Sequence, residues 1–211
     1  FLPVVEAVRE KTPLDYVFVT SPFDLHAPLR RTVMQMLLTV LGKSVPYGDA
    51  ISLRDVLATD VLATKVEGFK PAVLAADDMA LLQYTGGTTG VSKPAIISHR
   101  NMVSVTCQGW EMLKLADTKA GQERIISPLP LYHIYAFALV VTTGVHMGAH
   151  SMLVPDPRNI KAFVKLLRRW PATLFSGLNT LFVALMKDPD FARIDFSALK
   201  LTLSGGSALA S

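Results

Sequence analysis

The feature that most constrains the fold is a regular alternation of strand-like and helix-like segments in the second half of the chain. Short apolar runs predict strands at residues 124–127, 150–154, 172–175 and 199–203. Apolar residues at helical spacing predict helices between them, at residues 134–147, 160–170 and 179–187. Two strands joined by a helix in one sheet run parallel, through a right-handed crossover. The sequence therefore predicts an α/β fold built from parallel-sheet layers with flanking helices.

Two turns of distinctive composition follow strands of this predicted sheet. The first reads PLPLYH at residues 128–133, and the second reads SGGS at residues 204–207. Ligands of parallel sheets bind at the carboxyl ends of the strands, so both turns are candidates for a binding site. Taken singly, His133 is an ordinary residue at a helix start and Ser207 is an ordinary helix cap. Asn179, at the start of the helix predicted at residues 179–187, is likewise explained as an N-cap. A hydrolase nucleophile is not predicted, because neither Ser204 nor Ser207 lies in a G-x-S-x-G pattern.

The stretch with the most unusual chemistry is residues 84–95, which read YTGGTTGVSKPA. Apolar runs at residues 79–83 and 95–98 flank it and predict a strand, a tight loop and a strand. Glycines let another group approach the main chain, and N–H groups, hydroxyls and a lysine at one turn bind anions. The predicted ligand is a phosphate chain. The residues that supply these groups are Thr85, Gly86, Gly87, Thr88, Thr89, Gly90, Ser92 and Lys93.

This loop differs from the two commonest phosphate-binding loops. A P-loop places Gly-Lys directly before Ser or Thr, whereas Lys93 follows Ser92 and precedes a proline. A dinucleotide fingerprint reads G-x-G-x-x-G, whereas Gly86 and Gly87 are adjacent. The alternative is a glycine-rich hairpin without a ligand, but such hairpins seldom gather several hydroxyls and a lysine.

An amphipathic helix is predicted at residues 30–41, where apolar side chains recur at helical spacing. Arg30, Arg31 and Lys43 accompany it. Such a helix either packs on its own domain or lies on an anionic membrane surface, and the sequence leaves both alternatives open.

The other segments of the first half predict short elements. Residues 15–20 predict a short buried strand, and a capping pattern at Ser52 predicts a short helix at residues 53–57. Ser98 is predicted to cap a helix at residues 99–115, in which the lone cysteine is a small buried side chain. One face of this helix is predicted to carry Met102, Val105 and Met112.

Composition limits the partners and the compartment. A net charge of +4 suits anionic ligands or a membrane surface and is too weak to indicate nucleic acid. The single cysteine excludes an internal disulfide and indicates a reducing, cytoplasmic compartment, with peripheral contact to the inner membrane left open. No apolar stretch is long enough to span a bilayer, and the histidines show no metal-ligand spacing.

Four motifs resemble the adenylate-forming enzymes, which include acyl-CoA synthetases, luciferases and peptide-synthetase adenylation domains. They read YTGGTTGVSK at 84–93, PLPLYHI at 128–134, NTLF at 179–182 and DFSALKLTLSGG at 195–206. In order and spacing they are most similar to the bacterial long-chain fatty acid–CoA ligases. Pro94 departs from the glycine that usually follows the lysine, and proline cannot adopt positive φ.

The resemblance implies that residues 1–211 are a fragment of the large N-terminal, AMP-binding domain of the acetyl-CoA synthetase-like fold. Residues 1–78 would be a lead-in segment and residues 79–98 the phosphate loop region. Residues 99–211 would form an alternating strand and helix subdomain for substrate and adenine. The C-terminal lid domain would lie outside these residues, and we expect the fragment alone to be inactive.

The resemblance also implies roles for particular residues. His133 and Lys93 would be catalytic, and no metal ligand is expected in this chain apart from Thr88, which could reach Mg²⁺ through Mg-ATP. The phosphates of ATP would contact Tyr84, Thr85, Gly86, Gly87, Thr88, Thr89, Gly90, Val91, Ser92 and Lys93. The adenine would contact Ser204, Gly205, Gly206 and Ser207. The acyl group would contact Tyr132, His133 and Asn179.

The implied reaction is an ATP-dependent ligation in two steps. The carboxylate of a fatty acid attacks the α-phosphorus of ATP and expels pyrophosphate, and the thiol of coenzyme A then attacks the acyl-adenylate. ATP, Mg²⁺ and coenzyme A are the implied cofactors. Two alternatives stay open: another adenylating enzyme, such as an aryl-CoA ligase or an adenylation domain, and a non-catalytic nucleotide-binding module. A homodimer also stays open.

Overall fold

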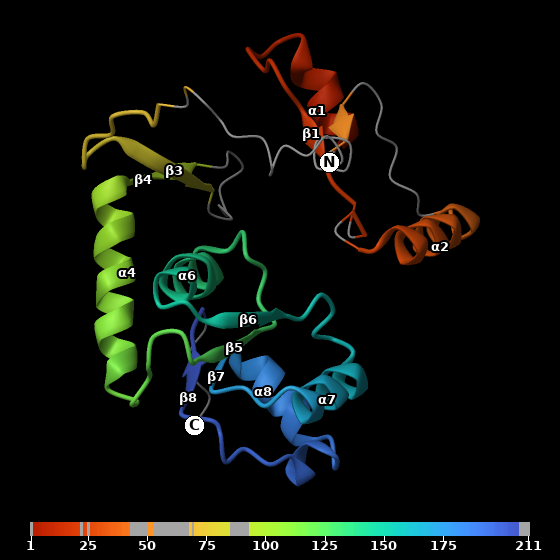
Figure 1. The fold of residues 1–211 in the computed structure, drawn as a ribbon, viewed down its shortest axis with the longest axis vertical. Coiled ribbons are helices and arrows are strands. Elements are labelled where there is room, and N and C mark those ends of the chain that lie inside the picture. The colour runs from red at the N-terminus through yellow and green to blue at the C-terminus, as the bar shows by residue number, and fades with distance from the viewer. Residues whose placement is uncertain are drawn as a thin grey trace. The chain divides into compact units, whose positions relative to one another are not determined.

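The structure is a computed structural model, and it describes residues 2–21, 23–24, 26–42, 50–52, 68, 70–84 and 93–206 (Figure 1). The chain divides into two compact units, Phe1–Ala72 and Val73–Ser211. The second unit contains all of the predicted site residues.

The second unit is built on a parallel sheet of four strands. The strands are β5 (Arg124–Ser127), β6 (His150–Leu153), β7 (Leu174–Gly177) and β8 (Leu201–Ser204), in the order β6-β5-β7-β8. Every neighbouring pair is parallel. The parallel sheet predicted from the alternation is therefore confirmed. The last two strands begin and end later than predicted, within the usual uncertainty of strand ends.

Helices connect these strands as predicted (Figure 1). Between β5 and β6 the chain forms one helical segment of three parts: α5 (Ile134–Ala136), the π-helix η1 (Phe137–Thr143) and α6 (Gly144–His146). Helix α7 (Ile160–Arg169) follows β6, and α8 (Asn179–Met186) with the short 3-10 helix η2 (Phe191–Arg193) follows β7. The π-helix was not predicted.

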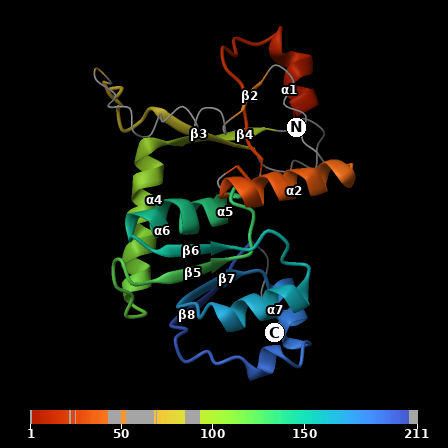
Figure 2. The same ribbon diagram turned by 45° about the vertical axis from the view of Figure 1, so that its right-hand side comes forward.

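Apolar side chains cover both faces of the sheet, because successive residues of a strand point to opposite sides. Ile126 and Phe175 pack on one face with buried residues of α7 and α8. Ile125 and Leu174, their neighbours in sequence, pack on the other face with Leu113 and residues of the segment from α5 to α6. Figure 2 shows the sheet between this segment and α7. The result is a three-layer arrangement of helices, sheet and helices.

Helix α4 (His99–Lys114) begins where the sequence predicted. The Ser98 hydroxyl accepts a hydrogen bond from the Asn101 N–H (3.2 Å), and the Asn101 side chain accepts one from the Ser98 N–H (3.0 Å). This reciprocal pair satisfies two donors at the helix start. The predicted cap at Ser98 is confirmed.

The face of α4 that carries Met102, Val105 and Met112 is not the face that packs most tightly. Val105 and Met112 are exposed, whereas Leu113 is fully buried. The close contact is at Gly109, where an added Cβ would lie 2.8 Å from the Thr143 hydroxyl of η1. Cys107 lies two residues before Gly109, on the opposite side of the helix, and its side chain is exposed. The prediction that Cys107 is buried is therefore wrong.

An antiparallel pair of strands precedes α4. β3 (Met79–Tyr84) pairs with β4 (Pro94–Ser98), with Tyr84 opposite Pro94. The predicted strands on both sides of the phosphate loop are confirmed. Residues 85–92 lie outside the residues that the structure describes.

The first unit contains α1 (Leu2–Arg9), α2 (Pro28–Val40) and two short parallel strands, β1 (Phe18–Val19) and β2 (Ile51–Ser52). The strand predicted at residues 15–20 is shorter than expected, and Phe18 is 57% exposed rather than buried, because β1 pairs over only two residues. Helix α2 begins at Pro28, whose fixed φ suits the first helical turn. The helix predicted at residues 53–57 lies outside the described residues. None of the described helices has the length and apolar character needed to cross a membrane.

Candidate functional site

The carboxyl ends of the four parallel strands form one edge of the sheet. Ser127 ends β5, and the PLPLYH turn begins directly after it; Ser204 ends β8 and is also the first residue of the glycine turn. The structure therefore brings the PLPLYH turn and the glycine turn to the same edge. Parallel sheets bind their ligands at this edge, so a binding site is expected here.

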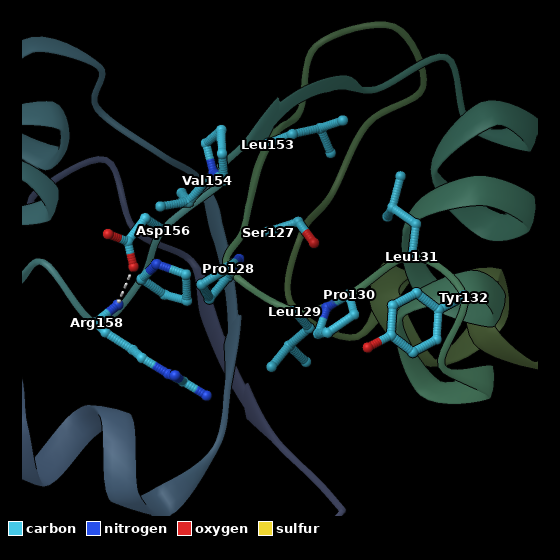
Figure 3. Close-up of a pocket in the computed structure, with 12 residues that line it drawn as sticks. Ser127, Pro128, Leu129, Pro130, Leu131, Tyr132, Leu153, Val154, Asp156 and Arg158 are labelled. Carbon is cyan, nitrogen blue, oxygen red and sulfur yellow. Dashed lines mark hydrogen bonds between the residues drawn. The ribbon is translucent and has the colours of Figure 1, made fainter. Parts of the chain in front are cut away.

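Two hollows lie at this edge and share part of their walls. The larger has a volume of about 660 Å³ and lies between the β5–α5 and β6–α7 connections (Figure 3). The smaller, of about 480 Å³, extends to the start of α8. Both fall in the usual size range of ligand pockets. The residues common to both hollows are Pro128, Leu129, Pro130, Pro157 and Arg158.

Most side chains that line these hollows are apolar. Leu131 and Leu153 line the larger hollow, and Leu178, Leu181 and Ala184 line the smaller one. Because the hollows share a wall, together they offer an extended apolar surface. Such a surface suits an elongated hydrocarbon better than a compact polar molecule.

Arg158 brings a positive charge to the wall that the hollows share. Its backbone N–H donates to the Asp156 carboxylate (3.3 Å), the bond drawn in Figure 3. Its guanidinium has no hydrogen-bond partner among the residues that the structure describes, and in Figure 3 it extends away from Asp156. The cation is therefore available to an anionic ligand, although sequence reasoning did not identify it.

His133 caps the start of α5. Its Nδ1 accepts a hydrogen bond from the Tyr135 N–H (3.3 Å), so in the neutral ring Nε2 carries the proton. The side chain is exposed. The structural role at a helix start is confirmed, and it leaves Nε2 free to donate to a ligand. Before it, Tyr132 is 83% exposed and lines the larger hollow.

Asn179 does not have the structural role that was predicted for it. Helix α8 is capped by Leu178 in extended conformation, and Asn179 is the first helical residue. The prediction that Asn179 is the N-cap is wrong by one position, because the chain turns into the helix directly after Gly177 and Leu178. Leu178 and Thr180, rather than Asn179, line the smaller hollow.

The glycine turn after β8 packs against an aromatic ring. A Cβ on Gly205 would lie 3.1 Å from the Tyr135 ring, closer than most side chains tolerate. Gly206 has φ of +79°, in the region that favours glycine. Gly205 therefore lets the turn approach Tyr135, which comes from the segment that also carries His133, while Gly206 lets the chain turn beside Leu178.

Three buried hydroxyl groups near this edge have no hydrogen-bond partner within the described part of the chain: those of Ser127, Tyr135 and Ser204. Burial raises the pKa of Tyr135, so its hydroxyl stays protonated. Buried polar atoms without partners are uncommon in folded proteins and often face a ligand or water. Tyr135 was missed in the sequence, where the only signal was an aromatic residue two positions after His133.

The predicted phosphate loop is described only at its two ends. Tyr84 ends β3, and Lys93 directly precedes β4, with both side chains exposed. The predicted contacts of Thr85, Gly86, Gly87, Thr88, Thr89, Gly90, Val91 and Ser92 fall outside the described residues, as does Ser207. The phosphate and adenine contacts of these residues stay predictions. Within the described ranges no group of three or more His, Cys, Asp or Glu residues could hold a metal ion.

The amino edge of the sheet contains a charged cluster. The Glu123 side chain is fully buried and accepts hydrogen bonds from the Lys119 N–H (2.8 Å) and the Lys200 ammonium (2.7 Å). Lys200 also donates to the Asp117 carbonyl (2.9 Å). Burial alone would raise the pKa of Glu123, but bonds from Lys200, Thr173 and Lys119 hold it below its ordinary value. These groups link the loops before β5 and β8.

Comparisons with known proteins agree with this geometry. The model of the family described as "AMP-binding enzyme" matches residues 16–211. The long-chain-fatty-acid–CoA ligase of Salmonella typhimurium is 36% identical over an alignment of 217 positions, which covers 98% of this chain and 36% of that protein. The protein of the same name from Bacillus subtilis is 33% identical, over 97% of this chain and 36% of its own length. The chain thus spans about 36% of the length of these relatives.

Solved structures share the fold at lower identity. The anthranilate CoA ligase AuaEII in complex with anthranoyl-AMP superposes with a TM-score of 0.70 at 20% identity, covering 99% of this chain and 35% of that one. The inhibitor-bound N-terminal domain of FACL13 from Mycobacterium tuberculosis gives 0.65 at 21% identity, covering 99% and 48%. The α/β fold expected from the resemblance is confirmed. Since the family model matches nearly the whole chain, the chain belongs to the AMP-binding enzyme family.

Proposed function

We propose that this chain carries nucleotide-binding and acyl-binding parts of an ATP-dependent ligase that joins a long-chain fatty acid to coenzyme A. The observation that carries the proposal is the pair of apolar hollows at the carboxyl edge of the sheet, beside the glycine turn. An extended apolar wall suits an alkyl chain, and the names of the relatives support the same class of acid.

The proposed reaction begins with the carboxylate of the fatty acid. One carboxylate oxygen attacks the α-phosphorus of ATP, the bond to the bridging oxygen breaks, and pyrophosphate leaves. The sulfur of coenzyme A then attacks the acyl carbonyl and AMP leaves. Negative charge grows on the phosphate oxygens in the first step, so donors already directed at them lower the barrier.

The residues are proposed to divide this work between them. Lys93 and the loop of residues 85–92 would hold the β- and γ-phosphates, with Mg²⁺ arriving bound to ATP and neutralising phosphate charge. His133, whose Nε2 is free to donate, would orient the acyl carboxylate. Gly205 and Gly206 would lie against the adenine, backed by Tyr135. Tyr132 and the apolar hollows would hold the acyl chain.

The test of the reaction is ATP–pyrophosphate exchange by the complete protein, with palmitate, acetate and benzoate compared as the acid. We expect exchange with palmitate to exceed exchange with the other two acids. Exchange with acetate or benzoate alone would support the adenylation step but would mean that the substrate is not a long-chain fatty acid. A folded protein that binds ATP but exchanges with none of the acids would indicate a non-catalytic nucleotide-binding module.

The phosphate loop is tested by Lys93→Ala and Thr88→Ala. Each removes one donor to the phosphates, so exchange should fall about 10- to 1000-fold. Lys165→Ala is the matched control, since Lys165 is an exposed lysine of α7. Unchanged exchange in Lys93→Ala, with Lys165→Ala also unchanged, would remove Lys93 from the proposed site.

A further inference from the structure

The smaller hollow has one charged side chain in a wall that is otherwise uncharged. Among the described residues that line it, Arg158 is the only ionisable one and Thr180 carries the only hydroxyl. We propose that this hollow binds a second, distal carboxylate, so that the protein accepts long-chain dicarboxylic acids as well as simple fatty acids. The inference rests on the proposed function of the two hollows, which is to hold the acyl chain.

The guanidinium of Arg158 is free to bind an anion. It forms no ion pair with any residue that the structure describes. Asp156, two residues earlier, accepts a hydrogen bond from the Arg158 backbone N–H, and Figure 3 shows the guanidinium extending away from it. Asp156 lines only the larger hollow. In the smaller hollow the charge of Arg158 therefore has no acidic neighbour on the wall, which favours a ligand that brings a negative charge.

The start of α8 adds donors to the same hollow. Thr180 is the second residue of this helix, and its side chain is exposed. No side chain caps α8, and the positive end of its dipole lies beside Leu178 and Thr180, which both line the hollow. The Arg158 guanidinium donates through several N–H groups, and the Thr180 hydroxyl can also donate. A carboxylate, which only accepts hydrogen bonds, suits these two side chains.

The reacting carboxylate is proposed to lie at the other end of the apolar wall. Tyr132 lines the larger hollow and directly precedes His133, whose free Nε2 would orient that carboxylate. Figure 3 shows Tyr132 and Arg158 on opposite sides of Pro128 and Leu129, which belong to the wall that the hollows share. The two hollows thus present donors at both ends and apolar side chains between them. A molecule with a carboxylate at each end of an alkyl chain matches this order.

A simple fatty acid would leave the Arg158 end of the wall without an anion. Its terminal methyl group gains nothing from a guanidinium. A terminal carboxylate, in contrast, can accept two parallel hydrogen bonds from the planar guanidinium, which offset the cost of removing the carboxylate from water. Arg158 is thus expected to decide how well the protein tolerates a charge at the distal end of the acid.

The test compares hexadecanedioate with palmitate in ATP–pyrophosphate exchange by the complete protein. The two acids have the same chain length and differ only at the distal end. Without a cation in the hollow, the second carboxylate would lower kcat/KM by about 100-fold or more. With Arg158 present, we expect the two values to lie within about 5-fold of each other. Exchange with palmitate but not with hexadecanedioate would overturn the inference and leave the proposed ligase function intact.

Matched variants test the two side chains. Arg158→Gln should lower the ratio of kcat/KM for hexadecanedioate to that for palmitate about 5- to 10-fold, because a neutral amide binds a carboxylate less strongly. Arg158→Lys keeps the charge and should recover part of this ratio. Thr180→Val removes the hydroxyl and should lower the ratio about 2-fold. Arg169→Gln is the control, since Arg169 is exposed in the last turn of α7 and lines neither hollow. An unchanged ratio in Arg158→Gln would overturn the inference.

Two other results would give Arg158 a different role. An equal fall in exchange with both acids would mean that it acts on the carboxylate being activated. Unchanged exchange with a raised KM for coenzyme A in the complete reaction would mean that it binds the phosphates of coenzyme A. Either result overturns the inference.

A binding measurement separates this inference from the proposed reaction. If no acid supports exchange, the ligase proposal fails, and calorimetric titration of hexadecanedioate into the complete protein tests the distal site directly. We expect the Kd to be about 5-fold higher in Arg158→Gln than in wild type. Equal Kd values in the two proteins would overturn the distal carboxylate site.

Discussion

The two edges of the parallel sheet use polar groups in different ways. At the amino edge, charged groups of Glu123 and Lys200 bind each other and backbone groups of neighbouring loops. At the carboxyl edge, neutral hydroxyls of Ser127, Tyr135 and Ser204 are buried without a described partner, next to two apolar hollows. The amino edge is not free of unpartnered groups, because Glu123 Oε2 and the Thr118 hydroxyl in the loop before β5 also have no partner among the described residues. The difference is that charged groups connect the loops at the amino edge, whereas neutral hydroxyls border the hollows at the carboxyl edge.

The largest expected effect is on the amino edge, from Lys200→Met. The substitution leaves the buried Glu123 carboxylate without its cation, so we expect the free energy of unfolding to fall by about 3 kcal/mol. This is the low end of the range for breaking a buried ion pair, because Lys200 is partly exposed. Urea unfolding measures it, with Lys165→Met as control. Pyrophosphate exchange at a temperature where the variant is folded should be unchanged. The double variant Glu123→Gln with Lys200→Met should recover part of the loss.

The second prediction addresses the carboxyl edge through Gly205→Ala. The added Cβ would lie 3.1 Å from the Tyr135 ring, so the turn or the ring must move by a few tenths of an ångström. We expect exchange at low ATP to fall about 10- to 100-fold, with little change in the urea midpoint. Adding Tyr135→Leu, which removes the ring, should restore part of the activity. A large drop in stability with normal exchange would place Gly205 among the residues that maintain the fold.

The third prediction concerns acid. Because the pKa of Glu123 is lower in the folded protein, its ionised form favours folding, fully so above the ordinary glutamate value of 4.5. This contribution is lost as the pH falls below 4.5 and through the folded pKa. We expect the free energy of unfolding of wild type to fall further than that of Glu123→Gln over that range. Urea titrations at several pH values measure the free energy of unfolding of both proteins. The same dependence of this free energy on pH in both would contradict the prediction.

The smallest expected effect is from Tyr135→Phe. The variant removes a buried hydroxyl that has no partner among the described residues, so the free energy of unfolding should stay equal or rise by up to about 1 kcal/mol. Tyr132→Phe, at an exposed ring, is the comparison. A loss of stability well beyond that of Tyr132→Phe would mean that the Tyr135 hydroxyl is satisfied within the protein, and the contrast between the two edges would weaken.

Local patterns in the sequence predicted the sheet well, because each strand and helix of the second unit is encoded by its own apolar period. They failed where tertiary packing decides. The buried side of α4 is fixed by the small residue Gly109 against Thr143, not by the most apolar residues of the helix. The contact of Tyr135 with Gly205 joins residues far apart in sequence and could not be seen in either motif alone. Nothing in the sequence distinguishes Arg158 from other surface arginines, because only the folded chain shows that it lines both hollows.

The π-helix Phe137–Thr143 has a consequence for how this protein tolerates changes in length. It lies between His133, which faces the carboxyl edge, and Thr143, which is held against Gly109 of α4. In an α-helix each residue turns the chain by about 100°. A π-helix holds about one more residue per turn than an α-helix, so deleting a single residue within it would relax it to ordinary α-helix and leave the two ends in nearly their present relative orientation. The same deletion in a regular α-helix would turn one end by about 100° relative to the other. The segment is therefore the place in this part of the chain where the loss of one residue would disturb the two ends least.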